Sequence, residues 1–285
     1  MSTIVQRTLS GAVYVAVIVG TVLAPTSLFF LTVIALMTVL GIREFINLTG
    51  KDTWLTVMSG LTGICMLLSF WSISYMAHYG TMTMKLEDTV IEWTLGISVV
   101  VYVLSSFAIL LAELYRQAEN PMKNWGRYFQ SLMMIALPFA CMVLLCNACP
   151  YYLLALFISV WVNDTGAYLV GMGTARLPHG NHKMFPRVSP KKSWEGLIGG
   201  ICFNLIAGYV FYRIGWIDRL WTALVFVLLT SVFGTLGDLM ESLMKRTVGV
   251  KDSGRFMPGH GGVLDRFDSM LLAAPVIVLF ALFTT

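Results

Sequence analysis

Long apolar runs limit what this chain can fold into more than any other feature of its sequence. Runs of about 20 mainly apolar residues are long enough to cross the hydrocarbon core of a bilayer as helices. Hydrophobic residues make up 57% of the chain and charged residues 12%, well outside the range of soluble globular proteins. We therefore predict an all-α, polytopic integral membrane protein with about nine transmembrane helices and no separate soluble domain.

Short polar segments separate the predicted spans. The spans cover approximately residues 9–23, 28–45, 54–75 and 94–114, a fifth ending near 149, and then 151–172, 194–214, 220–236 and 270–283. Solvated loops are predicted at residues 77–92, 115–127 and 173–192. This count places the loop 173–192 and the segment after residue 236 on the same side of the membrane.

The distribution of basic residues supports this topology. All but three of the 19 Lys and Arg residues fall in predicted internal segments, and the exceptions are Lys85, Arg213 and Arg219. Because internal loops of membrane proteins carry an excess of Lys and Arg, the N-terminus is predicted inside and the C-terminus outside. The two most polar segments then face the cytoplasm, where nucleoside triphosphates are found.

One segment near the C-terminus concentrates groups that bind phosphate and metal ions. Between Ser242 and Asp268 it contains five basic residues, three carboxylates, a histidine and three clustered glycines: Lys245, Arg246, Lys251, Arg255, Arg266, Asp252, Asp265, Asp268, His260, Gly259, Gly261 and Gly262. Cations neutralise phosphate oxygens, glycines let backbone N–H groups approach an anion, and carboxylates hold Mg²⁺. The alternative is a basic loop that only orients the protein, but such a loop needs neither His-Gly-Gly nor paired aspartates.

The order of these residues resembles the signature of the CTP-dependent phosphatidate cytidylyltransferases, also called the CDP-diacylglycerol synthases. The shared elements are a serine, Lys-Arg, Lys-Asp, Pro-Gly-His-Gly-Gly and Asp-Arg-x-Asp, which here are Ser242, residues 245–246, 251–252, 258–262 and 265–268. So many fixed offsets make this match specific, unlike a lone glycine motif. Met257 is a small departure, because another apolar residue is expected before the proline.

The resemblance covers roughly residues 160–285, whereas the N-terminal half matches only in being hydrophobic. We therefore predict catalytic membrane helices with cytoplasmic active-site loops over residues 151–285. Residues 1–150 are predicted to serve as scaffold and to provide lipid access. The resemblance also implies an integral protein of the bacterial inner membrane, with its active site facing the cytoplasm.

Two further polar elements match the family. Asn163 and Asp164 lie inside a predicted span, where an ionisable residue is costly and usually marks function or a paired contact. The alternative is that Asp164 only pairs with a base of the next loop. The stretch Ser-Pro-Lys-Lys-Ser-Trp-Glu-Gly, with Ser189, Lys191 and Lys192, suits a polyphosphate chain. The alternative there is an interfacial anchor, because Lys and Trp are both common at headgroup level.

Carboxylates at the ends of the last two spans are the candidate metal ligands. A helix would place Asp238, Glu241, Ser242 and Lys245 on one face. Asp265 and Asp268 are three apart, which predicts a second such face. Asp238 and Asp265 are the best candidates for shared Mg²⁺ ligands, the family points to the same two acids, and Asp268 is a third candidate. The alternative is a buried ion-pair network with the neighbouring arginines.

The resemblance implies a reaction of CTP with phosphatidic acid that yields CDP-diacylglycerol and pyrophosphate, with Mg²⁺ as cofactor. The implied catalytic residues are Asp238, Asp265, Lys245 and Arg266, and the implied substrate-binding residues are Lys191, Lys192, Ser189, Ser242, Arg246, Lys251, His260, Asn163 and Asp164. The phosphate of phosphatidate is its own nucleophile, so catalysis is expected to be positioning and charge neutralisation. His260 is expected to donate to phosphate, with a catalytic acid role left open.

Two other classes of function remain open from the sequence. A sister enzyme would use CTP on another lipid phosphate or transfer its γ-phosphate as a lipid kinase. A transporter would carry polar residues near the midplane of both halves, whereas here they gather at one face of the C-terminal half. Expected partners are CTP, phosphatidic acid and membrane lipids, not nucleic acid, and a homodimer is left open.

Overall fold

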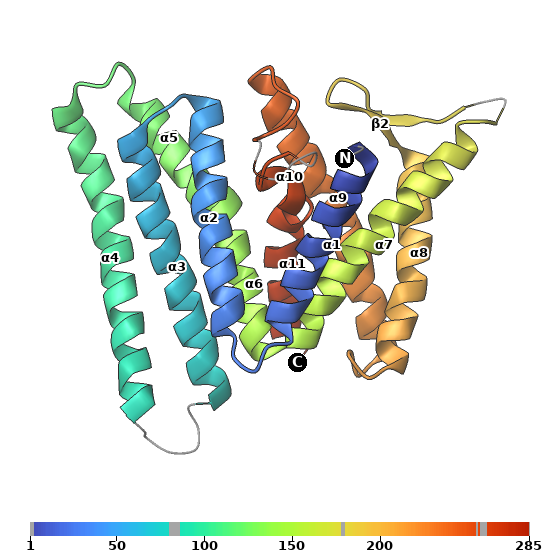
Figure 1. The fold of residues 1–285 in the computed structure, drawn as a ribbon, viewed down its shortest axis with the longest axis horizontal. Coiled ribbons are helices and arrows are strands. Elements are labelled where there is room, and N and C mark those ends of the chain that lie inside the picture. Colours follow the sequence, from blue (N-terminus) through green and yellow to red (C-terminus); the bar gives the residue numbers. More distant parts are fainter. Residues whose placement is uncertain (1–2, 80–85, 178–179, 255, 257–260, 285) are drawn as a thin grey trace. The chain divides into compact units, whose positions relative to one another are not determined.

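The computed structural model describes residues 3–79, 86–177, 180–254, 256 and 261–284, and helices dominate it (Figure 1). The helices of the first half are α1 (Thr3–Val22), α2 (Leu28–Thr49), α3 (Thr53–Tyr79), α4 (Leu86–Arg116), α5 (Pro121–Ser131), the π-helix η1 (Leu132–Ala136) and α6 (Leu137–Ala148). The second half contains α7 (Pro150–Thr174), β1 (Lys183–Phe185), β2 (Ser189–Ser193), α8 (Trp194–Arg213), α9 (Leu220–Thr247), α10 (Leu264–Phe267) and α11 (Met270–Leu282). The all-α prediction is confirmed, with one two-stranded hairpin as the exception among described residues.

Seven helices within the described residues are long and apolar enough to cross a membrane. Two shorter apolar helices, Thr8–Val22 and Met270–Leu282, correspond to the first and last predicted spans. The protein is therefore a polytopic integral membrane protein, and the count of nine spans stays a prediction.

Several helices extend beyond the predicted spans. Helix α9 continues to Thr247, because the polar residues of its last turns bond to one another, as the ion pair between Glu241 and Lys245 illustrates. The predicted loop 115–127 is wrong in its second half, since Asn120 accepts a hydrogen bond from the Lys123 N–H and starts α5 there. The predicted loop 77–92 is also too long, because α4 begins at residue 86.

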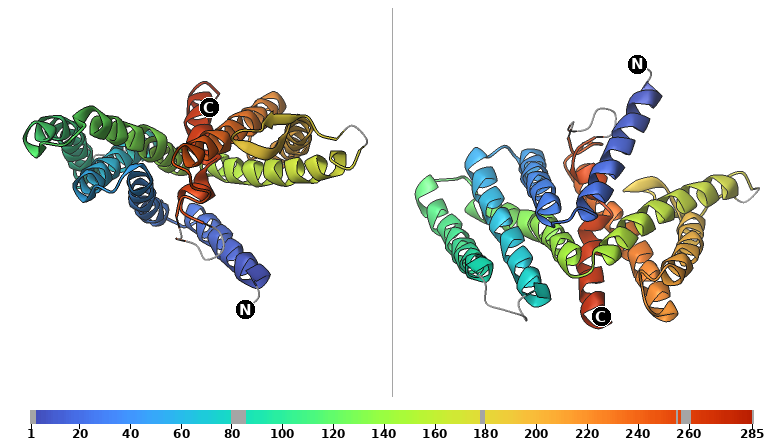
Figure 2. Two further views of the ribbon diagram at one scale, coloured as in Figure 1. Left: turned by 90° about the horizontal axis from the view of Figure 1, so that it is seen from above. Right: turned by 60° about the horizontal axis from the view of Figure 1, so that its bottom comes forward.

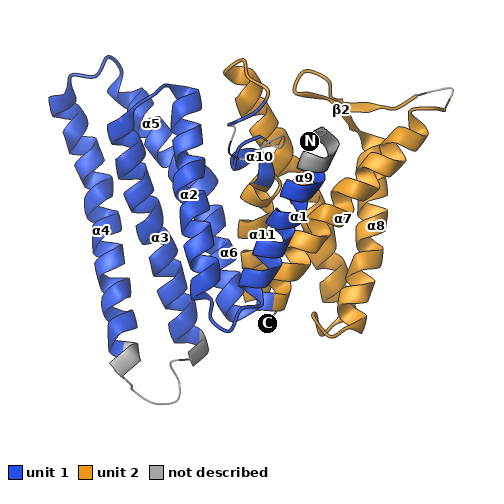
Figure 3. Ribbon diagram, in the orientation of Figure 1, with its two compact units in different colours: residues 1–150, 252–266 blue, residues 151–251, 267–285 orange. Residues whose placement is uncertain are grey.

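The chain forms two compact units (Figure 3). Unit 1 comprises residues 1–150 and 252–266, and unit 2 comprises residues 151–251 and 267–285. One boundary between the units falls at residue 150, where the sequence analysis also divides the chain. Residues 252–266 of the C-terminal signature, however, pack with unit 1. The proposed division of roles between the halves stays a prediction.

Hydroxyl groups join the helices of unit 1. Helix α3 packs against both α4 and α6, and the Oγ1 of Thr62 lies 2.8 Å from the Oγ of Ser105 in α4. The Oγ atoms of Ser69 and Ser98 repeat this contact at 2.8 Å. Such bonds satisfy polar groups inside an apolar bundle, and each contributes on the order of 0.6 kcal/mol.

Charged residues close one end of unit 1. Buried Arg127 donates to the carbonyl oxygens of Ile46 and Gly50, so carbonyl groups at the C-terminal end of α2 gain hydrogen-bond partners. Asp52 caps the N-terminus of α3, because its Oδ1 accepts the Leu55 N–H at 3.0 Å. Its Oδ2 pairs with Arg116 at 2.9 Å. Burial raises the pKa of Asp52, but the Leu55 N–H and Arg116 outweigh that effect and hold the pKa below its ordinary value.

Replacing Asp52 with Ala should lower the stability of the protein in detergent by about 1 kcal/mol, because a helix cap is lost. Asp52→Asn should lose less, since an amide oxygen still caps the helix. A depressed pKa stabilises the fold above the unfolded pKa of about 4 and loses that effect as the pH falls below it. Thermal melts should therefore show a smaller difference in melting temperature between wild type and Asp52→Asn at pH 4 than at pH 7. A larger difference in melting temperature at pH 4 than at pH 7 would contradict this account.

Unit 2 is built on close helix contacts. Helix α9 packs against α8 and α11. A Cβ at Gly208 would lie 2.9 Å from a methyl group of Val227, so the missing side chain lets α8 approach α9. In the same interface the Asn204 Nδ2 donates to the Ser231 Oγ at 2.8 Å. These contacts fix the helix that carries Asp238.

A β-hairpin connects α7 to α8, at the end where α7 finishes and α8 begins (Figure 2). Strands β1 and β2 pair antiparallel, and Ser193 then caps α8 by accepting the Gly196 N–H at 3.1 Å. The carboxylate of Glu195 accepts the backbone N–H of His182, and the His182 Nδ1 lies 2.6 Å from its Oε1. Within the loop predicted at 173–192, residues 183–185 and 189–193 thus form a strand pair, and β2 carries Lys191 and Lys192 just before α8.

Candidate active site

A pocket of about 490 Å³ lies within unit 2, between α7, the hairpin and the N-terminal part of α8, and α9. This volume is typical of small-molecule sites. Its polar lining includes Asn163, Asp164, Tyr168, Asn181, Lys183, Lys191, Lys192, Ser193, Thr235 and Asp238. The structure therefore brings together three polar elements that are far apart in the sequence, namely Asn-Asp in α7, Lys-Lys in the hairpin and Asp238 in α9.

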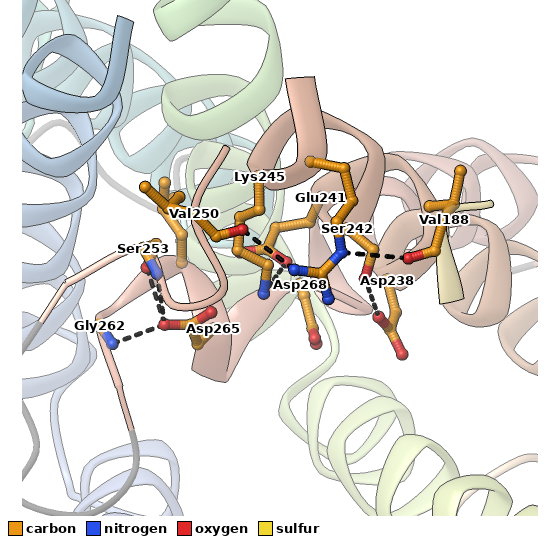
Figure 4. Close-up of polar contacts among 12 residues, drawn as sticks. Val188, Asp238, Glu241, Ser242, Lys245, Val250, Ser253, Gly262, Asp265 and Asp268 are labelled. Atoms are coloured by element: carbon orange, nitrogen blue, oxygen red, sulfur yellow. Dashed lines mark hydrogen bonds and ion pairs between the residues drawn. The ribbon is translucent and has the colours of Figure 1, made fainter. Parts of the chain in front are cut away.

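Asp238 contacts two side chains, of which Figure 4 shows Ser242. The Lys192 Nζ lies 2.6 Å from its Oδ2, and the Ser242 Oγ donates to its Oδ1 at 3.2 Å. Lys192 also donates to the carbonyl oxygen of Thr235 at 3.3 Å. A cation from the hairpin thus neutralises the carboxylate of α9 at the wall of the pocket.

Asn163 and Asp164 reach the same pocket from α7. Asp164 is exposed there, and the nearby lysine, Lys192, forms its ion pair with Asp238 instead. Asn163 is buried, and its Oδ1 has no hydrogen-bond partner among the described residues. These observations do not favour the interpretation that Asp164 serves only to pair with a base of the next loop.

The polar face predicted on α9 exists. The Lys245 Nζ lies 2.5 Å from the Oε2 of Glu241, one turn earlier, and the Glu241 side chain is fully buried. Lys245, an expected catalytic residue, is thus engaged with its own helix. The alternative of a buried ion-pair network concerned the arginines next to the candidate metal ligands, so the pair of Glu241 with Lys245 does not test it.

Asp268 lies in the turn before α11 and accepts the Ser269 N–H at 2.6 Å. Burial raises the pKa of the Asp268 carboxyl well above its usual range, and the negative charge of Asp238 adds to this effect. A cation bound among these carboxylates would offset their mutual repulsion. The donor chemistry of this region therefore suits a divalent cation.

The remaining predicted site residues of unit 2, Ser189, Arg246 and Lys251, do not line the pocket. Arg246 donates to the carbonyl oxygens of Val250 at 3.1 Å and Val188 at 3.4 Å, so it links the end of α9 to the hairpin. Ser189 begins β2, and Lys251 is exposed. In this structure Arg246 therefore holds backbone, and its contact with phosphate stays a prediction.

Asp265 belongs to unit 1, where three donors converge on its Oδ2 (Figure 4). The Ser253 N–H donates at 2.9 Å, the Ser253 Oγ at 3.0 Å and the Gly262 N–H at 2.7 Å. The carboxylate is thereby held in one orientation at the start of α10.

The prediction that Asp265 and Asp268 share one helical face is wrong. Helix α10 ends at residue 267 and α11 begins at residue 270, so Asp268 lies in the turn between them. Residues up to Arg266 belong to unit 1, and the chain turns at residues 268–269 before the apolar helix α11 begins. Arg266 has a buried Nε with no hydrogen-bond partner among the described residues. His260 lies outside the described residues, so its predicted role stays a prediction.

Sequence reasoning missed one carboxylate entirely. Glu44 of α2 accepts hydrogen bonds from the Val263 N–H at 3.0 Å, the Leu264 N–H at 3.1 Å and the Ser253 Oγ at 3.1 Å. All three donors belong to the C-terminal signature, in the part that contributes to unit 1. The only available signal was an acidic residue in the last turns of an otherwise apolar helix.

Fold and pocket together define a polytopic membrane protein with a pocket lined by both lysines and carboxylates. A sequence model of the cytidylyltransferase family matches residues 5–284, and the chain therefore belongs to that family. Phosphatidate cytidylyltransferases of Staphylococcus haemolyticus, Staphylococcus saprophyticus and Staphylococcus aureus are each 47% identical to it over 128 residues. That alignment covers 45% of this chain and 47% of each relative, so the chain spans about half the length of the curated relatives it matches.

Proposed function

We propose that the protein is a phosphatidate cytidylyltransferase, which transfers the cytidylyl group of CTP to phosphatidic acid and releases pyrophosphate. The observation that carries this proposal is the pocket of unit 2, where Asp164 and Asp238 share one cavity with Lys191 and Lys192. Membership of the cytidylyltransferase family and the name of the curated relatives support the same reaction.

The pocket is suited to catalysis by positioning. A phosphomonoester has a second pKa near 6, so phosphatidate brings a dianionic nucleophile without a protein base. Lys191 and Lys192 lie on the hairpin side of the pocket, where they can bind phosphate oxygens. Lys192 already neutralises Asp238, so a phosphate near this lysine would also lie near the carboxylate. The apolar helices around the pocket keep the acyl chains within the bilayer.

Mg²⁺ is the cofactor we propose, and the residues present fit it. The described residues contain no group of three or more His, Cys, Asp or Glu that could hold a metal ion by themselves. Mg²⁺ is usually bound by one or two carboxylates together with substrate phosphates, and Asp164 and Asp238 both line the pocket. When bound, Mg²⁺ would supply charge stabilisation for the leaving pyrophosphate. The motif pairs Asp265 with Asp238 as a further ligand, and that pairing stays a prediction.

The bacterial relatives support a bacterial inner-membrane location, and the alternation of basic residues supports an orientation with the pocket open to the cytoplasm. The lysines of the hairpin belong to one of the two most basic internal segments, each of which carries five Lys or Arg residues. CTP is made in the cytoplasm, so this orientation lets the nucleotide reach the pocket. Labelling of a cysteine introduced at the exposed Arg187 of the hairpin turn, in intact cells and in inverted vesicles, tests it. Labelling only in inverted vesicles is the expected result.

The direct experiment is an assay of the purified protein with phosphatidic acid and CTP, with and without Mg²⁺. The CTP carries its label either in the cytidine or in the γ-phosphate. Cytidine label entering the lipid with release of pyrophosphate is the expected result, and it should require Mg²⁺. Lipid labelled from the γ-phosphate would instead identify a CTP-dependent kinase, and no transfer of either label would refute both enzymes.

A further inference from the structure

We propose that Glu44 is a positioning residue for the reaction, which fixes residues 252–266 so that Asp265 presents its carboxylate in one orientation. This inference rests on the proposed function and on the expected role of Asp265 in it. Glu44 lies in α2, far from every motif of the C-terminal half in sequence, and its contacts join it to the signature within unit 1.

The hydrogen bonds of Glu44 are directed at the backbone of the signature. Its Oε1 accepts the Val263 N–H, and its Oε2 accepts the Leu264 N–H, so the two oxygens hold consecutive residues. Val263 and Leu264 are each 1% exposed, so their N–H groups are shielded from water. Loss of the carboxylate would leave buried donors without an acceptor, which is costly.

Two glycines of the segment make room for this carboxylate. A Cβ at Gly254 or at Gly262 would collide with an oxygen of Glu44. A side chain at either position would therefore force the loop away from α2. Contact with Glu44 thus explains why small residues stand at positions 254 and 262.

Packing one turn earlier on α2 supports the same arrangement. A Cβ at Gly41 would lie 3.2 Å from Ile135 and 3.4 Å from Leu264. The α2 surface is therefore flat enough at this point for Leu264 to lie against it, and Glu44 follows three residues later on the same face. Apolar contact and carboxylate thus hold the same two residues of the signature.

Ser253 links Glu44 to Asp265. Its Oγ lies 3.1 Å from the Oε2 of Glu44 and 3.0 Å from the Oδ2 of Asp265. A hydroxyl has one proton, so it can donate to only one of the two carboxylates at a time. Asp265 keeps the N–H donors of Ser253 and Gly262 in either case. The orientation of Asp265 thus depends on a loop that Glu44 holds at both ends.

The test compares Glu44→Gln with wild type and with Glu92→Gln, a control at an exposed glutamate of α4. Glutamine keeps the volume of the side chain but turns an N–H₂ group toward one of the two backbone donors. We expect kcat to fall about 10- to 100-fold, as is typical when a residue that orients a ligand group is changed. KM for CTP should stay within about twofold, because Glu44 is placed on the loop and not on the nucleotide.

Amide hydrogen exchange provides a readout that is independent of activity. Exchange at Val263 and Leu264 should be faster in Glu44→Gln than in wild type, and should be unchanged in Glu92→Gln. A wild-type kcat in Glu44→Gln would overturn the proposal, whatever the exchange shows. So would a rise in KM for CTP at unchanged kcat, since that would place Glu44 on the substrate.

Two outcomes are separated by the design. If wild type transfers no cytidylyl group, the proposed function fails, and the positioning role proposed here falls with it, while the exchange data still report whether Glu44 holds the loop. If Glu44→Gln does not insert and fold, Ser253→Ala takes its place, because it removes the shared hydroxyl alone. Ser253→Ala should lower kcat and leave KM for CTP unchanged, and full activity in that variant would overturn the proposal.

Discussion

Replacing Asp238 with Asn should lower the rate of cytidylyl transfer by roughly a thousandfold while leaving the protein folded. Asp238 lines the pocket, and its Oδ2 lies 2.6 Å from the Lys192 Nζ. The change removes the negative charge that neutralises this lysine. Losing one carboxylate that stabilises a bound cation costs about 4 kcal/mol of transition-state stabilisation, or roughly three powers of ten in rate. The amide oxygen can still accept from the Ser242 Oγ, so the local structure of α9 is preserved.

The measurement is the labelled-CTP assay across a range of Mg²⁺ concentrations. Asp218→Asn is the matched control, because Asp218 is an exposed residue between α8 and α9 and lines no part of the pocket. Asp218→Asn should be as active as wild type. Ordinary turnover and ordinary Mg²⁺ dependence in Asp238→Asn would show that this carboxylate is not part of the reaction.

Replacing Asp265 with Asn should abolish turnover to a similar extent. Asparagine can direct its amide oxygen toward the Ser253 and Gly262 N–H groups, so the segment keeps its hydrogen bonds. Only the charge is lost, at nearly constant volume. The expected loss is again roughly a thousandfold in kcat, since a carboxylate in the metal-ligand role that we propose for Asp265 would contribute several kcal/mol.

Thermal stability in detergent shows whether Asp265 acts in the reaction or only holds residues 252–266 together. A normal melting temperature together with lost activity supports a role in the reaction. A lower melting temperature with activity that survives at low temperature would mean that Asp265 serves only to tie residues 252–266 together. Asp265→Ala should differ from Asp265→Asn in stability, because it leaves the N–H groups of Ser253 and Gly262 without their acceptor, whereas the Ser253 hydroxyl can still donate to Glu44.

Sequence patterns predicted the helices of this protein better than their ends. Apolar runs identify segments that must be buried in lipid, so the predicted spans correspond to observed helices. Apolar runs do not predict the end of α9, because the run ends near residue 236 but the helix continues to Thr247. The continuation is stabilised by side-chain pairs such as Glu241 with Lys245, which average hydropathy does not register.

The site was predictable as a set of residues and less so as an arrangement. Lys192 and Asp238 were both expected at the site, and the structure pairs them. The hairpin that presents the lysine was not expected, since its strands are only three and five residues long. Glu44 was missed because a single carboxylate at the end of an apolar helix has no motif around it, and its partners are backbone N–H groups that no sequence pattern displays.

The bond between Glu44 and Val263 spans 219 residues of sequence. Chains are synthesised at about 5 to 20 residues per second, so α2 emerges roughly 10 to 45 seconds before its partner in the signature. During that interval the carboxylate of Glu44 has no Val263 or Leu264 to hold, and water or lipid headgroups must solvate it. The segment that carries Asp265 is therefore among the last parts of the protein to be assembled, and a nascent chain that stops before residue 263 lacks the two backbone N–H groups that Glu44 holds.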